Sequence, residues 1–159
     1  MLVFGIACLA VYALNAWAAN DDKSHSDAAG MSSLLCVSYG MSNVLVEIYG
    51  FPEAILAFPI MDAIMSFMVW RAWKRQRQTL KVGVLGLMVG QLATHAAAVS
   101  AWKFGSMGFP GLYNYVLIIN VTFAAQLAVV SSAGVGHALG RLVAYLSRLR
   151  GDHPVSGVQ

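Results

Sequence analysis

Two titratable side chains, Asp62 and His95, lie inside apolar stretches of the sequence, where a charge is costly. Asp62 is the one carboxylate in the run 54–73, AILAFPIMDAIMSFMVWRAW, and lies close to its middle. An ionised carboxylate at membrane depth costs at least about 2.5 kcal/mol on insertion scales, and desolvation favours the protonated form. We therefore expect either a proton or cation site at Asp62, or a neutral or paired carboxyl that fastens helices together.

The surroundings of Asp62 suggest how either role would be filled. Pro59 lies one turn earlier, and a proline inside a helix leaves a backbone carbonyl free, here that of Ile55. His95 is the single histidine within a predicted span, so a buried Asp62–His95 couple would titrate as a unit. The alternative is that His95 bonds a neighbouring hydroxyl or carbonyl group.

Amide side chains form a second polar set at membrane depth. Interhelical amide hydrogen bonds contribute roughly 0.6–2 kcal/mol each, so these residues are expected to join helices, with pore lining as the alternative. They are Gln91, Gln126 and Asn120.

Motifs for catalysis or metal binding are absent from the sequence. There is no G-x-S-x-G, H-E-x-x-H or Walker pattern and no second aspartate within a span. The two cysteines, Cys8 and Cys36, lie in apolar runs without metal-ligand spacing. We expect a protein that is not an enzyme and has no metal or cofactor.

The elements that must position these residues are membrane helices. Of the 159 residues, 58% are hydrophobic and 11% are charged, against about 25% charged residues in soluble domains. The mild excess of positive charge lies next to apolar runs, so nucleic acid is not an expected partner. We expect one domain over residues 1–150 and a short tail over 151–159.

Five apolar runs have the length of about 20 residues that a membrane-spanning helix needs. Glycines at 134, 136 and 140 permit a bend after the fifth run. Residues 137–150 then show an amphipathic helical pattern, which predicts a helix on the membrane surface or a straight extension of the fifth helix. The fold class is therefore an all-α integral membrane protein with a C-terminal amphipathic helix, and its spans are 1–19, 31–49, 54–73, 82–102 and 115–135.

Positive charge is distributed unevenly between the two sides that these spans define. Nine of the ten Lys and Arg residues fall on one side, and Lys103 alone falls on the other. By the positive-inside rule the N-terminus lies outside and the C-terminus inside, which indicates a bacterial-type inner membrane with a cytoplasmic C-terminus. The basic run that dominates this count could also bind anionic lipid headgroups; it comprises Arg71, Lys74, Arg75, Arg77 and Lys81.

The fourth span carries a stripe of small residues spaced mostly four apart. Small residues let helix backbones approach closely in lipid, so this face is expected to pack against another helix, of the same chain or of a second copy. The stripe consists of Gly83, Gly86, Gly90, Thr94 and Ala98.

Three functions fit these features. The first is a non-catalytic, oligomerising subunit of a membrane assembly, which packs through the stripe against itself or a larger complex. The second is a pore or channel, including a holin-like oligomer, in which several copies line a path with Asp62, Gln91 and Gln126. The third is a small proton-coupled transporter that uses Asp62 as the coupling carboxylate.

Overall fold

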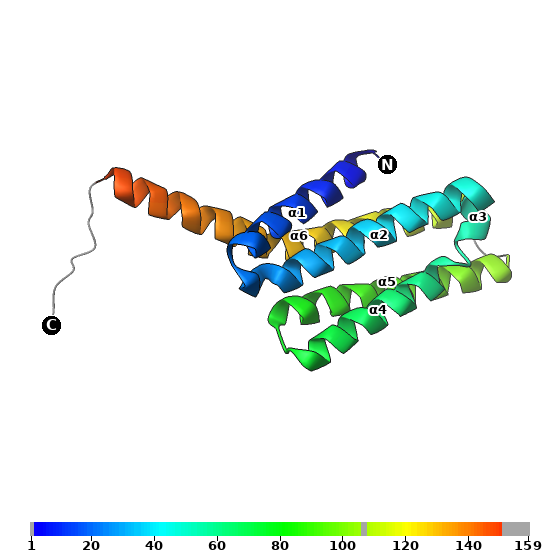
Figure 1. Cartoon of the computed structure of the whole chain (residues 1–159). Helices are drawn as coiled ribbons and strands as arrows, with labels where there is room; N and C mark the ends of the chain where they lie inside the picture. The colour runs from blue at the N-terminus through cyan, green and yellow to red at the C-terminus, as the bar shows by residue number, and fades with distance from the viewer. Residues whose placement is uncertain (1, 106–107, 151–159) are drawn as a thin grey trace.

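The computed structural model describes residues 2–105 and 108–150, and this part of the chain is helical without strands. The all-helical prediction is confirmed. In Figure 1, α4 and α5 form a hairpin that lies beside a group made of α1, α2 and α6. The elements are α1 (Leu2–Asp21), η1 (Lys23–His25), α2 (Ser26–Tyr49), α3 (Phe51–Ala54), α4 (Phe58–Arg75), α5 (Thr79–Lys103) and α6 (Phe109–Leu149).

The bundle has two ends, which we name by the short helices that they contain. The α3 end holds α3 and the connection from α5 to α6, and the η1 end holds η1 and the connection from α4 to α5 (Figure 1). At the η1 end the side chain of Asp22 accepts a hydrogen bond of 2.8 Å from the backbone N–H of Ser24, which holds the pKa of Asp22 below its ordinary value. Because α1 ends at Asp21 and α2 begins at Ser26, the connection between them is shorter than the gap 20–30 between the first two predicted spans.

The run 54–73 is not one helix, and this corrects the predicted third span. The chain turns after α3, and α4 begins at Phe58 with Pro59 in its first turn. Proline is favoured there because its missing N–H has no helical partner to lose. Asp62 therefore lies in the second turn of α4, towards the α3 end, and not at the middle of a span.

The helix does not end at the glycines that follow the fifth predicted span. Residues Phe109–Leu149 form one continuous helix, so residues 137–149 are an extension of the fifth predicted helix and not a separate one. A glycine inside a helix costs only about 1 kcal/mol relative to alanine, which packing can offset. Gly134 is buried where α6 crosses α1: a Cβ there would lie 2.7 Å from Oδ1 of Asn15. Beyond this crossing α6 leaves the bundle (Figure 1), and residues 139–150 are all exposed. The tail predicted for residues 151–159 lies outside the described residues.

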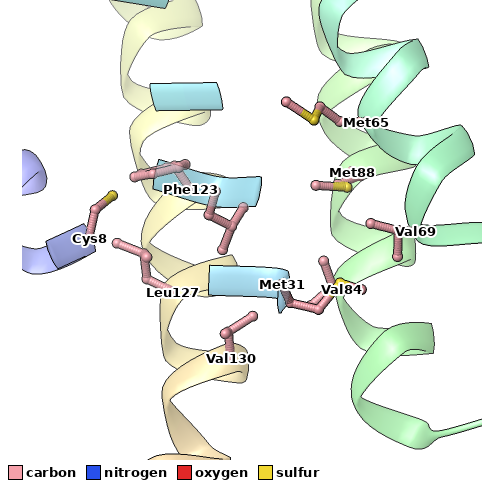
Figure 2. Close-up of a cluster of buried hydrophobic side chains, with 10 residues drawn as sticks. Cys8, Met31, Met65, Val69, Val84, Met88, Phe123, Leu127 and Val130 are labelled. Carbon is pink, nitrogen blue, oxygen red and sulfur yellow. The ribbon is translucent and has the colours of Figure 1, made fainter. Parts of the chain in front are cut away.

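Apolar side chains from five helices form the main core (Figure 2). The cluster contains Cys8 of α1, Met31 of α2 and side chains from α4, α5 and α6. The methionines Met65 and Met88 both extend from the α4–α5 hairpin towards the side of Phe123 in this view; such flexible side chains fill irregular gaps. A second, smaller cluster lies at the α3 end and comprises Ala54, Ile55, Phe58, Met61, Ala98 and Tyr115.

Four helices are long and apolar enough to cross a membrane, which is consistent with a multi-pass membrane protein. These segments are Val3–Asp21, Lys23–Tyr49, Thr79–Lys103 and Gly111–Leu149. The helix α4 is not among them, because its 18 residues include Asp62 and a strongly basic last turn. Much of the outer surface is apolar: Val3, Ile60 and Val121, for example, are at least 60% exposed.

Candidate functional site

Three helices bring a carboxyl, an imidazole and a phenol into one chain of contacts. Nε2 of His95 on α5 lies 2.9 Å from Oδ2 of Asp62 on α4. Nδ1 of the same ring lies 2.6 Å from the hydroxyl of Tyr115 on α6. All three residues are at least 95% buried. His95 therefore bridges Asp62 and Tyr115.

One oxygen of the Asp62 carboxyl group lacks a hydrogen-bond donor among the described residues. Oδ2 of Asp62 is buried and is within ion-pair distance of His95, yet it accepts no well-aligned hydrogen bond from a described residue. Ser66 lies one helical turn further along α4, and its buried Oγ also lacks a hydrogen-bond partner among the described residues. A buried acceptor without its hydrogen bond costs about 1–3 kcal/mol, so Oδ2 of Asp62 is an acceptor whose hydrogen-bonding capacity is not used within the described residues.

A cavity of ≈ 280 Å³ adjoins this bridge. His95 and Tyr115 lie on its wall, and so does Phe58, whose ring centroid is 5.5 Å from that of His95. Residues of α1, α2 and α6 complete the lining, including the stacked rings of Tyr39 and Phe123. The wall is thus mixed aromatic and polar, which is the character of small-molecule sites.

Amide and hydroxyl groups give the cavity its other polar contacts. Nε2 of Gln126 donates a 3.0 Å hydrogen bond to Oε1 of Gln91, which joins α6 to α5 and leaves the amide nitrogen of Gln91 for another acceptor. Asn120 is exposed yet also lines the cavity, so the cavity reaches the surface of the bundle at this residue. Ser38 and Asn43 contribute polar groups from α2.

The small-residue stripe of α5 is divided between the interior and the surface. Ala98 is buried, and a Cβ on Gly83 would lie 3.4 Å from Val129 of α6. Gly86 and Gly90 have no neighbouring atom within 4 Å of such a Cβ. Thr94 donates its hydroxyl to the carbonyl of Gly90 within the helix. The centre of the stripe therefore faces away from the rest of the chain.

The basic run also divides into two parts. Arg71, Lys74, Arg75 and Arg77 are exposed, and Lys74 lies over the ring of Trp70 at 4.3 Å. Lys81, by contrast, has a side chain that is only 1% exposed. It is therefore turned away from the headgroup position that the sequence pattern predicts for it.

Lys81 instead ties the two halves of the bundle together at the η1 end. Its Nζ lies 2.9 Å from Oδ2 of Asp27, in the first turn of α2. It also donates a 3.3 Å hydrogen bond to the carbonyl of Gln76. A buried ammonium needs such partners because removing its hydration is costly.

A second polar cluster at the η1 end joins α1 to the part of α6 that leaves the bundle. We call this part, residues 137–149, the α6 extension. Oδ2 of Asp21 accepts from Arg141 and lies 3.2 Å from Nε2 of His137. The ring of Trp17 meets that of His137 edge-on, with 5.1 Å between the centroids. These groups are partly or fully exposed to solvent.

Several of these contacts are not apparent from sequence reasoning. The sequence predicts that Tyr115 is an interfacial aromatic residue. However, Tyr115 lies 11 residues, or about three helical turns, before Gln126, so the two side chains share one face of the helix. That spacing could have placed it with the buried polar groups. The Lys81–Asp27 pair and the bond from Nδ2 of Asn15 to the carbonyl of Val130 join distant segments, and no local pattern marks them.

Comparisons with protein-family models, curated proteins and solved structures found no match to this chain. Within the described residues there is also no group of three or more His, Cys, Asp or Glu side chains that could hold a metal ion.

Proposed function

We propose that this chain is a small multi-pass membrane protein that binds a small molecule in the cavity and couples its binding to proton movement through Asp62. This is the proton-coupled transporter among the three functions that fit the sequence. The observation that carries the proposal is the position of His95: it contacts Asp62 with one ring nitrogen and Tyr115 with the other, on the wall of the cavity.

The proposed topology has five spans. The helix α4 packs along α5, a helix that is apolar enough to cross a membrane, so we propose that α4 crosses beside it. The basic side chains at the end of α4 then lie at the inner surface with the C-terminus, in a bacterial-type inner membrane. There the four exposed basic residues from Arg71 to Arg77 and the α6 extension would meet anionic headgroups.

Proton coupling can be tested in proteoliposomes that contain a pH-sensitive dye. A panel of small organic cations, anions and neutral solutes is added outside, and the internal pH is followed. We expect one class to move protons with the natural chain and not with Asp62→Asn. Glu47→Gln is the matched control, because Glu47 is exposed and does not line the cavity. Proton movement that persists in Asp62→Asn, or that no class elicits, would contradict the proposal.

An oligomerising, non-catalytic subunit is the second candidate, and the open face of α5 favours it. The space around Gly86 and Gly90 would accept a helix backbone of a second copy or of a larger complex. Gly90→Leu is expected to reduce oligomer mass in nonionic detergent, measured by light scattering. Gly140→Leu is the control, because Gly140 is equally open but lies on the α6 extension. Equal masses for both variants would remove this support.

A pore-forming oligomer has less support from the geometry. Gln91 and Gln126 bond to each other inside one chain, whereas a pore lining needs polar groups that face a shared axis. This function stays a prediction of the sequence.

A further inference from the structure

The charges around the cavity differ sharply between its wall and the layer behind it. Among the described lining residues there is no lysine, arginine, aspartate or glutamate. Asp62 lies directly behind His95, and its side chain is only 6% exposed. Lys81, the buried lysine of the described residues, is paired with Asp27. The described lining residues therefore offer an anionic ligand no permanent positive charge, and burying an unpaired anion is strongly unfavourable.

Aromatic rings supply the other half of the recognition chemistry. Five of the described lining residues are aromatic, and their rings come from four helices: Phe4, Tyr39, Phe58, Tyr115 and Phe123. The faces of such rings attract cations within about 6 Å, by up to about 2 kcal/mol when the cation is desolvated. Rings in front and a carboxylate behind make a cavity that suits an organic cation with an apolar body.

The size of the cavity limits the ligand. Its volume of ≈ 280 Å³ lies near the lower end of about 300–1,000 Å³ that is usual for ligand sites. We infer that the cavity binds a small lipophilic monocation, such as a substituted amine or quaternary ammonium compound, in exchange for a proton held between Asp62 and His95. This inference names the substrate class of the proposed function and therefore rests on it.

The exchange conserves charge at the site. When the Asp62–His95 pair holds one extra proton, the carboxyl has no need of a further cation. As the organic cation enters, that proton leaves to solvent and the carboxylate becomes the counter-ion of the ligand. Among the described residues, the titratable groups near Asp62 are His95 on α5, which contacts it, and Tyr115 on α6, which bonds the other nitrogen of His95; Tyr39 of α2 lies on the cavity wall. Binding of the cation should accordingly weaken as the pH falls.

Three probes of similar size separate the charge from the shape of the ligand: phenyltrimethylammonium, neutral 2-phenyl-2-propanol and anionic benzoate. Binding to the purified full-length protein in nonionic micelles is measured by calorimetry, with empty micelles as the blank. At alkaline pH we expect the cation to bind at least about tenfold more tightly than the alcohol, which is 1.4 kcal/mol, and benzoate not to bind. At a lower pH, where the pair still holds its proton, binding of the cation in weak buffer should release protons.

Three variants test which side chains cause the preference for the cation over the alcohol. Asp62→Asn should make the affinities for cation and alcohol equal, while Glu47→Gln should leave the preference intact. Phe58→Leu, which keeps the carboxyl, should weaken binding of the cation more than that of the alcohol. If the alcohol binds as tightly as the cation, if benzoate binds best, or if Asp62→Asn keeps the preference, the cation inference is wrong while the cavity remains a binding site. If no probe binds and no solute class moves protons in proteoliposomes, the proposed function fails as well.

Discussion

Among the described residues, each end of the bundle contains a pair of oppositely charged residue types with a buried member, and the two pairs differ in how completely their polar atoms are satisfied. At the η1 end, Lys81 is held by Asp27 and by the carbonyl of Gln76. Towards the α3 end, Asp62 contacts His95, but its Oδ2 atom lacks an aligned hydrogen bond, and the cavity begins beside it.

This difference separates a structural role from a chemical one. A buried charge with all of its partners in place resists change, because removing any partner leaves a desolvated charge. A group with unused bonding capacity beside a cavity can instead exchange its partner for a ligand or a proton. The following substitutions test whether the two pairs divide in this way, and they are ordered by the expected loss of stability.

Asp27→Ala should cause the largest loss. It leaves the buried ammonium of Lys81 without its counter-ion, and breaking a buried pair costs about 3–5 kcal/mol. We expect about 3 kcal/mol, the lower end, because the side chain of Asp27 is 26% exposed. Thermal unfolding in micelles measures it. Adding Lys81→Met should recover much of the loss, and a double variant as unstable as Asp27→Ala would contradict this explanation.

Gly134→Ala should be the next most damaging change. The added Cβ would lie 2.7 Å from Oδ1 of Asn15 and 2.8 Å from Cγ of Leu14, so α1 and α6 must move apart. Overpacking of this kind costs typically about 1–3 kcal/mol. Gly136→Ala, where nothing lies within 4 Å, is the matched control in the same unfolding assay. Equal stability of the two variants would show that the crossing is loosely packed.

Asp62→Asn should alter stability little and ligand exchange strongly. The amide keeps the shape of the side chain, so we expect a change of about 1 kcal/mol or less, the size of one hydrogen bond. Unfolding of this variant and of Asp27→Ala is compared under the same conditions. A loss as large as that of Asp27→Ala would mean that Asp62 is a structural tie and would end the distinction between the two pairs.

Asp21→Asn should have the smallest effect on the bundle. Its partner Arg141 is 61% exposed, and exposed pairs contribute about 0.2–1 kcal/mol, less in high salt. Proteolysis near the end of α6 offers a more sensitive readout than global unfolding. Faster cleavage in the variant is expected at low ionic strength, and a rate equal to that of the natural chain would show that the contact does not hold the extension.

The sequence predicts best those features that depend on neighbouring residues. An all-helical chain follows from apolar runs of the right length, because a backbone in lipid must satisfy its hydrogen bonds within the segment. Asp62 and His95 stood out because titratable groups are rare in such runs. The prediction of one helix over residues 54–73 is wrong because Pro59 is compatible both with a kinked helix and with the first turn of a new helix. Only the position of the turn before Pro59 distinguishes these two structures.

Tertiary structure decided what each polar group meets. The pattern offered Asp62, a hydroxyl or a carbonyl as the partner of His95, and the packing of α4 and α6 on α5 places Asp62 and the Tyr115 hydroxyl at its two nitrogens. The same packing buries Lys81, whereas the rest of the basic run is exposed, and it leaves the centre of the α5 stripe on the surface. Helix formation depends on residues a few positions apart, so sequence alone could determine it. Pairing across helices depends on how they rotate and cross, and only the folded bundle settles that.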